Sequence, residues 1–443
     1  MFVVILVYAK EGVSMKFDEA LEALTQLNKR GIHPGLEGIK KLLAALGNPE
    51  SGLKVVHVVG TNGKGSTALF ISEMLKASGK RCGLYSSPAV FDDREIIKIN
   101  GRAISKADYA RLVATVCEAN TFGCTRFEVE TAMAFAYFKE RGCDIAVIEA
   151  GMGGLMDATN VVTDTVAAVI TPIGMDHRDY LGETVAEIAK QKAGVIKPGC
   201  VVVTAPQVPE AMEVIRAKAA EVGAECVAAD SNAVSKVKLG LNKTSFAYKK
   251  FSGLEINLRG QFQVVNACVA VEVAGAVSLA EKAVSKGLTE ARESGRFEKI
   301  CDKPLFYIDG AHNEPASIAL RECIKTYFTK KKIIYIMGML RDKDVTSVIR
   351  NTVDLAECVF TVATPNAART LSAYELADVV REFNPMVTSV DSIEEAVEMA
   401  FMMASQDKDT VILAFGSLSH LKRIKETVDN RKSFKIDCHG AKR

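Results

Sequence analysis

Short apolar runs alternate with helical patterns along most of the chain. Runs typical of strands occupy residues 55–59, 144–149, 166–171, 200–204, 305–309, 332–338, 357–363 and 410–415. Segments with apolar residues at helical spacing separate most of them, for example 127–141, 184–197, 209–222 and 393–404. This alternation predicts an α/β protein with mainly parallel sheets and helices on both faces.

The pattern changes twice, which predicts the domain organisation. Residues 234–260 alternate polar and apolar positions, as antiparallel strands appended to a first domain would. A second α/β set begins near residue 296, so we expect one domain over 15–295 and another over 296–443. Residues 1–14, which include the apolar run 2–9, precede a Met that opens an amphipathic helix, and we expect them to be a non-native or disordered start. A length of 443 residues fits two or three domains of roughly 150 residues.

The composition of the chain indicates which partners and which cellular compartment to expect. The chain has 56 Lys and Arg against 54 Asp and Glu, so no basic surface indicates nucleic acid. No apolar stretch reaches the ~20 residues that span a bilayer, so we expect no membrane association. The 11 cysteines form no CxxC pair. They favour reduced thiols in the cytoplasm over a disulfide framework or a zinc ribbon.

A glycine-rich turn follows the first strand-like run, and a helical pattern follows the turn. Residues 60–67 read Gly-Thr-Asn-Gly-Lys-Gly-Ser-Thr. The glycines let backbone N–H groups converge on an anion, and the next helix adds the positive end of its dipole. Lys64 offers a charge for phosphate oxygens, and Ser66 or Thr67 offers a hydroxyl for Mg²⁺. Gly65 separates the lysine from Ser66, unlike the usual spacing; the alternative is a plain turn with a solvated lysine.

Four further segments carry polar side chains near strand or helix ends. Glu149 ends a strand-like run, and Asp176 and His177 follow the next one. Residues 190–197 hold three lysines near a helix end, and residues 306–313 form a strand with a polar turn. Carboxyl ends of parallel strands meet at one sheet edge, where these groups would surround ATP phosphates and Mg²⁺.

Each of these segments also has an ordinary structural interpretation. Glu149 is then an exposed strand-end carboxylate, His177 a loop histidine, and the lysines a solvated helix face. Thr125 and Glu128 have the spacing of a helix capping box. The repetition of one geometry at several strand ends favours the functional interpretation.

The motifs together resemble the bifunctional dihydrofolate synthase/folylpolyglutamate synthase family, a branch of the Mur ligase superfamily, from about residue 15 to about residue 425. The segments that carry the resemblance are 60–66, 86–88, 94–95, 99–101, 125–128, 157–160, 176–177, 192–194, 263–267, 295–298 and 309–313. The chain departs from the family at Leu155, commonly Arg, and at Ala89, often His. Both departures lie beside the expected folate pocket.

The resemblance implies a fold and a set of site residues. The fold would be a P-loop, Mur-ligase-like ATPase domain with a mainly parallel sheet, followed by a smaller Rossmann-like domain. ATP would contact Thr61, Asn62, Gly63, Lys64, Gly65, Ser66, Thr67, Asn266, Arg296, Asp309 and His312. The metal ligands would be Ser66, Glu149, His177 and carbamylated Lys192. The folate would contact Ser87, Pro88, Thr125, Phe127 and Asp157. Catalysis would depend on Lys64, His177 and Lys192.

The implied activity is that of an ATP-dependent amide ligase. The γ-phosphate of ATP would activate the carboxylate of dihydropteroate or of a (tetrahydro)folate as an acyl phosphate, which the amine of L-glutamate attacks. ATP, two Mg²⁺ ions and a monovalent cation such as K⁺ would take part, in a monomer whose second domain closes over the site. The alternatives are another Mur-family amide ligase and an ATP-binding regulator without turnover. A peptidoglycan-type ligase would need a whole domain before Gly60.

Overall fold

The computed structural model describes residues 15–31, 33–365 and 369–440. The expectation for residues 1–14 therefore lies outside the described residues. The chain forms two compact units. Unit 1 comprises the residues up to Lys236 together with Phe246–Ile256 and Gln263–Ala291. Unit 2 comprises Val237–Ser245, Asn257–Phe262 and the chain from Arg292.

Unit 1 is built on an eight-stranded sheet with the strand order β4-β3-β2-β5-β1-β6-β7-β8. Its strands are β1 (Val55–Val59), β2 (Cys82–Tyr85), β3 (Ile97–Ile99), β4 (Arg102–Ala103), β5 (Ile145–Glu149), β6 (Thr165–Ile170), β7 (Val201–Thr204) and β8 (Glu225–Ala228). Neighbours from β2 to β8 pair in parallel, whereas β3 and β4 pair antiparallel at the edge. The predicted mainly parallel sheet is confirmed.

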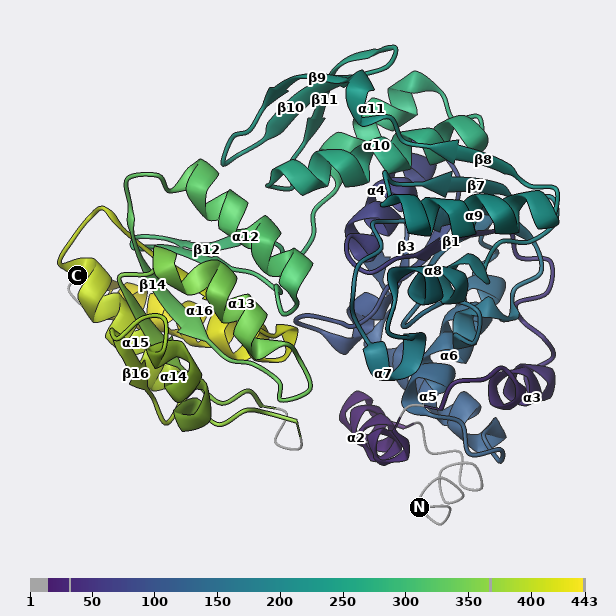
Figure 1. Cartoon of the computed structure of the whole chain (residues 1–443). Helices are drawn as coiled ribbons and strands as arrows, with labels where there is room; N and C mark the ends of the chain where they lie inside the picture. Colours follow the sequence, from purple (N-terminus) through teal and green to yellow (C-terminus); the bar gives the residue numbers. More distant parts are fainter. Residues whose placement is uncertain (1–14, 32, 366–368, 441–443) are drawn as a thin grey trace. The chain divides into compact units, whose positions relative to one another are not determined.

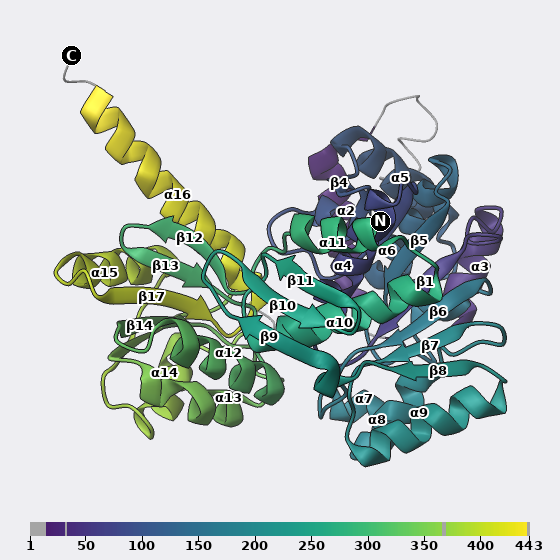
Figure 2. The ribbon, with the colours of Figure 1, turned by 90° about the horizontal axis from the view of Figure 1, so that it is seen from above.

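Helices precede, connect and follow these strands (Figure 1). They are α2 (Phe17–Leu27), α3 (Glu37–Ala45), α4 (Lys64–Ala77), α5 (Lys106–Ala119), α6 (Arg126–Glu140), α7 (Arg178–Leu181), α8 (Val185–Ala193), α9 (Pro209–Glu221), α10 (Gln261–Ala276) and α11 (Glu281–Glu290). Short 3₁₀ turns are η1 (Asn28–Arg30), η2 (Asp93–Ile96), η3 (Ala158–Val161) and η4 (Ser231–Ala233). Figure 2 shows β6, β7 and β8 side by side, with α9 alongside them.

Helix α8 is shorter than the pattern over 184–197 predicts. Thr184 caps its N-terminus by accepting from the backbone N–H of Glu187, and the helix ends at Ala193. Lys197 thus lies beyond the helix, because the residue before a proline is biased away from helical geometry.

Apolar residues of α2, α3, α5 and α6 form one cluster, which includes Val55 of β1. A second cluster lies around α8 and α9 and includes Val59 of the same strand. Side chains two residues apart on a strand point to the same face. The middle residue of β1, His57, therefore lies on the strand face that both clusters cover.

A three-stranded sheet with the order β11-β10-β9 follows β8. Its strands are β9 (Val234–Lys238), β10 (Thr244–Tyr248) and β11 (Phe251–Ile256). The predicted strands are present, but residues 237–245 group with unit 2, whereas the sequence pattern suggested an appendage to the first domain alone. The polar–apolar alternation predicts strands without saying where they pack.

Unit 2 contains a six-stranded sheet with the order β12-β13-β17-β14-β15-β16, parallel except for β12 against β13. Its strands are β12 (Glu298–Asp302), β13 (Leu305–Ile308), β14 (Lys332–Met337), β15 (Cys358–Thr361), β16 (Val387–Ser389) and β17 (Thr410–Phe415). Its helices are α12 (Glu314–Tyr327), α13 (Val345–Thr352), α14 (Ala373–Arg381), α15 (Ile393–Ser405) and α16 (Leu418–Gly440), with the 3₁₀ turn η5 (Val353–Leu355).

The alternation of side chains along β13 shows both faces of this sheet to be covered. Tyr307 belongs to the apolar cluster that includes residues of α12, α13 and α14. The adjacent Phe306 points the other way and packs on Phe401 of α15, with ring centroids 5.9 Å apart. Unit 2 is thus a second α/β layer structure, as predicted.

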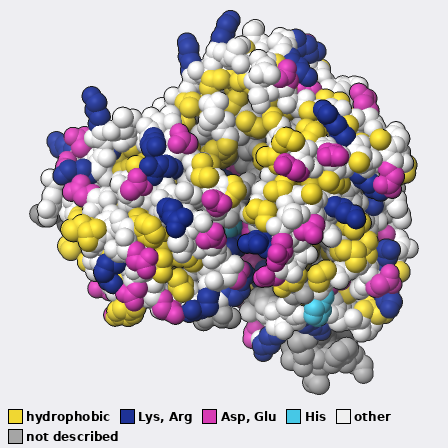
Figure 3. All heavy atoms as spheres, in the orientation of Figure 1, with side chains coloured by type: hydrophobic (Ala, Val, Ile, Leu, Met, Phe, Trp, Pro, Cys, Tyr) yellow, Lys and Arg dark blue, Asp and Glu magenta, His cyan; other side chains and the backbone are white. Residues whose placement is uncertain are grey.

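Acidic and basic side chains are interspersed over the face of the molecule shown in Figure 3, in keeping with the near-balanced composition. Among the residues that the structure describes, no helix has the length and apolar character needed to cross a membrane.

Candidate active site

The glycine-rich turn connects β1 to α4 at the carboxyl edge of the unit 1 sheet. Gly63 precedes α4 in the left-handed conformation, with φ 84°. A Cβ at this position would lie 2.4 Å from Asn266 Oδ1, so both the backbone geometry and the close approach require glycine. The Thr61 hydroxyl donates to the Gly174 carbonyl oxygen at 2.9 Å, which ties the turn to the loop after β6.

Three buried polar side chains connect the start of α4 to α10. Gln263 Nε2 donates to Ser66 Oγ at 3.1 Å, and Asn266 Nδ2 donates to Gln263 Oε1 at 3.0 Å. Ser66 and Asn266 were predicted from the sequence to contact ATP, and the structure brings them together through Gln263. Thr67 is buried too, and its hydroxyl has no hydrogen-bond partner within the described chain.

Two lysines lie at this turn. Lys64 Nζ donates to the Thr61 carbonyl oxygen at 3.3 Å, and Lys192 Nζ, reaching from α8, donates to the Gly60 carbonyl oxygen at 2.7 Å. Lys192 is buried. Burial, together with the charge of Lys64, lowers the pKa of Lys192 to about 7. A substantial fraction of the Lys192 amine is therefore neutral at physiological pH.

Glu149 is the last residue of β5 and lies in register with Val58 of β1. Its buried carboxylate accepts a short hydrogen bond from the hydroxyl of Ser86, which follows β2. The adjacent strands β2, β5 and β1 thus deliver Ser86, Glu149 and the glycine-rich turn to one edge, as expected for parallel strands.

Asp176 and His177 occupy the loop between β6 and α7. His177 has φ 51°, and its backbone N–H donates to Asp176 Oδ1 at 2.9 Å. Its ring Nε2 lies 4.0 Å from Asp176 Oδ2. In the described parts of the chain, no three His, Cys, Asp or Glu side chains gather as a metal site. The predicted metal set therefore depends on Ser66 and a modified Lys192 as well.

Two of the predicted folate residues, Thr125 and Phe127, lie at the start of α6. Thr125 is the N-cap of α6: its backbone N–H donates to Glu128 Oε2 at 2.7 Å, and its hydroxyl accepts from the Glu128 N–H at 3.3 Å. The capping interpretation of Thr125 is thus confirmed. The half-buried Phe127 ring lies 6.1 Å from the Tyr85 ring. Ser87 is half-buried and Pro88 exposed, in the loop after β2.

Asp157 is buried and organises the turn after β5. Its oxygens accept from the backbone N–H groups of Met152 at 2.8 Å and Thr159 at 3.0 Å, and from the Thr159 hydroxyl at 2.5 Å. Leu155, in place of the family's usual Arg, is largely exposed, whereas Ala89 packs against the apolar cluster of α5 and α6.

The predicted residues of unit 2 cluster at the end of β13. Asp309 is buried, and its oxygens accept from the backbone N–H groups of Phe297 at 2.8 Å and Ala311 at 2.7 Å. Burial raises the pKa of Asp309, and the charge of Arg296 opposes that shift. His312 Nδ1 lies 2.8 Å from the Gly310 carbonyl oxygen.

Gln263 and Ser86 lie within segments 263–267 and 86–88, which carry the family resemblance, but neither was assigned a role of its own in the site. Gln263 precedes Asn266 by one helical turn in a mainly apolar helix, a spacing that could have identified their contact. The Ser86–Glu149 contact depends on the pairing of β2 with β5, which the sequence does not reveal.

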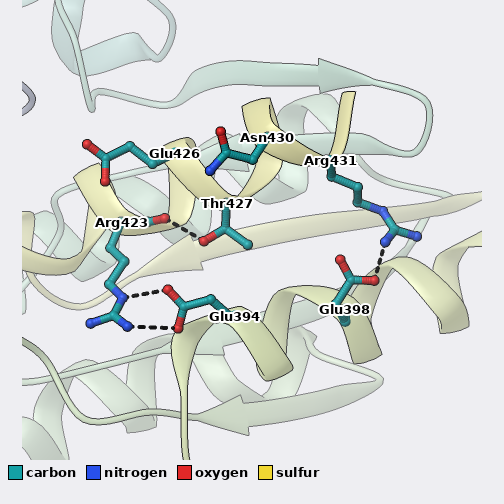
Figure 4. A pocket seen from close by; sticks show the side chains of 7 residues that line it. All are labelled: Glu394, Glu398, Arg423, Glu426, Thr427, Asn430 and Arg431. Carbon is teal, nitrogen blue, oxygen red and sulfur yellow. Dashed lines mark hydrogen bonds and ion pairs between the residues drawn. The ribbon is translucent and has the colours of Figure 1, made fainter. Parts of the chain in front are cut away.

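A separate pocket of unit 2 lies between α15 and α16 (Figure 4). Arg423 Nε donates to Glu394 Oε1 at 2.5 Å, and Arg431 pairs with Glu398. These two ion pairs engage four of the five charged side chains of the lining with one another, and we assign no ligand to the pocket.

Comparison with known proteins defines the class first. The Mur ligase middle domain matches residues 58–274, and the Mur ligase, glutamate ligase domain matches residues 295–418. The folylpolyglutamate synthase of Lacticaseibacillus casei is 35% identical over 434 residues, covering 93% of this chain and 98% of that protein. The dihydrofolate synthase/folylpolyglutamate synthase of Bacillus subtilis is 32% identical and covers 90% and 96%.

A solved structure agrees with these relatives. The folylpolyglutamate synthase of Mycobacterium tuberculosis, complexed with ADP and AMPPCP, superposes with a TM-score of 0.82 at 31% identity, covering 90% of this chain and 97% of that one. The chain belongs to the folylpolyglutamate synthase/dihydrofolate synthase family of Mur ligases.

Proposed function

We propose that this protein is an ATP-dependent ligase that joins L-glutamate to dihydropteroate, to a reduced folate, or to both, through an acyl phosphate. The observation that carries the proposal is the convergence of Lys64, the buried Lys192 and the N-terminus of α4 on one glycine-rich turn. The family supplies the substrate class, because relatives that match nearly the whole chain are named for these reactions.

The turn is suited to hold the phosphates of ATP. The 14-residue helix α4 begins at Lys64, so its free N–H groups and dipole favour an anion there. Lys64 adds a positive charge. Phosphoryl transfer requires positioning and charge neutralisation rather than a protein nucleophile, and these groups provide both. Asn266 would contact the nucleotide beside the turn. By family resemblance, Arg296, Asp309 and His312 of unit 2 would also bind ATP.

The donor set fits Mg²⁺, which prefers hard oxygen ligands. The Glu149 carboxylate and the Ser66 hydroxyl are such donors, and both are buried at the carboxyl edge of the sheet. We assign Ser66, Glu149 and His177 as metal ligands together with Lys192. Bound Mg²⁺ would neutralise phosphate charge. Two Mg²⁺ ions and a monovalent cation are proposed on family resemblance.

Lys192 fits the role of a carbamate. A carbamate forms when a neutral amine adds CO₂ and loses a proton, and the lowered pKa of Lys192 provides the neutral amine. The ammonium form would repel Mg²⁺, whereas the carbamate presents two anionic oxygens. The contact of Lys192 Nζ with the Gly60 carbonyl oxygen of the glycine-rich turn supports this proposal.

In the proposed reaction, a substrate carboxylate oxygen attacks the γ-phosphorus of ATP and ADP leaves. The amine of glutamate then attacks the acyl carbon and forms the C–N bond. The acyl C–O bond breaks, phosphate leaves with its electron pair, and the proton of the amine passes to the leaving phosphate or to solvent. Phe127 would stack on the pterin, with Ser87, Pro88, Thr125 and Asp157 shaping its pocket. Exclusion of water protects the acyl phosphate from hydrolysis.

The test is a reconstitution with purified protein, MgATP, glutamate and either dihydropteroate or tetrahydrofolate. Phosphate release that depends on both co-substrates, with the glutamylated product detected by mass, supports the ligase. Release without them indicates a plain ATPase, and nucleotide binding without release indicates a regulator. Activity with a different carboxylate would identify another Mur-family amide ligase. We also propose that the protein acts as a monomer in the cytoplasm, which gel filtration and cell fractionation would check.

A further inference from the structure

A histidine occupies the middle of the central strand of unit 1. His57 is the third residue of β1, which pairs with β5 on one side and β6 on the other. The side chain is fully buried on the strand face that two apolar clusters cover. A buried polar ring in apolar surroundings requires a hydrogen-bond partner, so the contacts of His57 are informative.

Two hydrogen bonds connect this ring to the turn after β5. His57 Nε2 lies 2.8 Å from Thr159 Oγ1, and Thr159 Oγ1 lies 2.5 Å from Asp157 Oδ1. The Asp157 carboxylate also accepts from the backbone N–H groups of Met152 and Thr159. Three accepted hydrogen bonds use most of the capacity of a carboxylate. Asp157 therefore acts on a substrate through the turn that it holds.

The donors and acceptors determine the direction of this hydrogen-bond chain. Burial raises the pKa of the Asp157 carboxyl, and the hydrogen bonds that its oxygens accept oppose that shift. Both oxygens face backbone N–H groups, which can only donate, so Asp157 acts as the acceptor and the Thr159 hydroxyl gives its single proton to it. The hydroxyl oxygen then accepts from His57, which requires the proton on Nε2. His57 Nδ1 has no partner among the described residues, and an orphaned buried acceptor is better tolerated than an orphaned N–H.

The turn held by Asp157 touches the proposed folate side and α8. A Cβ on Gly151 would lie 2.6 Å from Phe127 Cζ, so the turn backbone lies directly on that ring. The Leu155 N–H donates to the Gln191 carbonyl oxygen at 2.7 Å, just before Lys192. A displaced turn would therefore disturb both the Phe127 ring and the C-terminal end of α8.

We propose that His57, Thr159 and Asp157 form a relay of fixed proton direction, from His57 Nε2–H through the Thr159 hydroxyl to the Asp157 carboxylate. This relay holds the turn of residues 151–157 against Phe127, which makes His57 and Thr159 positioning residues for the carboxylate-bearing substrate. The identity of that substrate rests on the proposed function, whereas the proton direction does not. Burial, together with the charge of Lys197, lowers the pKa of His57 to about 3, so the ring is neutral under working conditions.

The proton direction can be measured on the intact wild-type protein. The chain has six histidines, so ¹⁵N-histidine labelling gives a small set of imidazole signals. We expect one buried imidazole with a protonated Nε2 and an unprotonated Nδ1, and its signals should be absent from His57→Gln. The opposite tautomer at His57 would overturn the relay, whether or not any ligase activity is found.

Matched variants test the positioning role. The amide nitrogen of glutamine reaches the place of the histidine Nε2, whereas that of asparagine reaches only the place of Nδ1. His57→Asn and Thr159→Val should raise the KM for dihydropteroate about tenfold and leave the KM for ATP within about twofold. His57→Gln and Thr159→Ser should stay close to wild type in both constants.

Several outcomes would overturn the relay. An equal rise in the two KM values would show a general structural role, and so would a Gln variant no better than the Asn variant. If Thr159→Val fails to fold, the imidazole signals of wild type and of Thr159→Ser decide the question. A wild-type protein with the expected tautomer but no activity on dihydropteroate or tetrahydrofolate would refute the proposed function and leave the proton direction intact.

Discussion

Units 1 and 2 each hold a buried charged group at a turn that follows a parallel strand, Lys192 reaching its turn from α8, but they compensate these charges differently. In unit 2, the Asp309 carboxylate accepts hydrogen bonds from two backbone N–H groups, and the positive charge of Arg296 favours its ionised form. In unit 1, the Lys192 ammonium donates to the Gly60 carbonyl oxygen, and the positive charge of Lys64 disfavours its charged form. At Asp309 the chain's own groups oppose part of the effect of burial on the pKa, whereas at Lys192 the charge of Lys64 acts in the same direction as burial.

The buried histidines of the two units also differ in their partners, but here the group with a hydrogen-bond partner lies in unit 1. His57 of unit 1 is hydrogen-bonded to Thr159, whereas both ring nitrogens of His420 of unit 2 have no well-formed hydrogen bond within the described chain. Burial lowers the pKa of His420 to about 4, and the backbone of Ser417 opposes this shift. Burial alone therefore does not identify a functional group, and the compensation that each group finds is more informative.

Lys64→Ala should have the largest effect on activity. Loss of the lysine removes charge at the phosphate turn and should lower kcat/KM for ATP about a thousandfold. The exposed Lys190 offers a matched control, since Lys190→Ala should leave turnover nearly unchanged. Steady-state phosphate release, with circular dichroism to verify the fold, measures both variants. Near-normal turnover in Lys64→Ala would contradict the phosphate site in unit 1.

Lys192→Met should separate activity from stability. The substitution removes a buried amine at little change in volume, so the melting temperature should be unchanged or higher. The proposed carbamate is lost at the same time, and activity should fall about a hundredfold. Calorimetry and ligase assays measure the two quantities. A large fall in melting temperature would instead assign Lys192 a structural role like that of Asp309.

The glycine-rich turn was predictable because its signals are local. An apolar strand, three glycines, a lysine and three hydroxyl side chains lie within 13 consecutive residues, 55–67. The connection between His57 and Thr159 was not predictable, because these residues are 102 positions apart and meet only through the fold. The burial of Lys192 could not be predicted from the sequence either, because the helical pattern over 184–197 does not show which of its three lysines is buried.

Asp309→Asn tests the compensated charge of unit 2. An amide keeps one acceptor oxygen but turns an NH₂ group toward a backbone N–H of Phe297 or Ala311. An unsatisfied buried donor costs about 1–3 kcal/mol, and we expect unit 2 to lose that much stability. Urea unfolding followed by pulse proteolysis, with fragments assigned to each unit by mass, measures it. An unchanged midpoint for unit 2 would show that the two N–H groups do not depend on the charge.

The acid sensitivity of the two buried histidines should give the smallest effect. Each histidine has a folded-state pKa, about 3 for His57 and about 4 for His420, below the ordinary value of 6.5. The unfolded chain therefore binds protons first as the pH falls. Stability is fully present above pH 6.5 and declines below it until the folded pKa is reached, by about 1 kcal/mol per histidine between pH 7.5 and 5.5.

Apolar variants distinguish the two histidines at neutral pH. His420→Leu should abolish the part of the stability loss between pH 7.5 and 5.5 that is due to His420. It should not lower stability at pH 7.5, because no well-formed hydrogen bond is lost. His57→Leu should remove the same acid loss but cost about 1 kcal/mol at pH 7.5, because Thr159 loses its donor. Urea midpoints of each unit at the two pH values measure both. Equal costs at pH 7.5 would mean that the bond from His57 to Thr159 adds nothing to unit 1, and the contrast between the units would then rest on Lys192 and Asp309 alone.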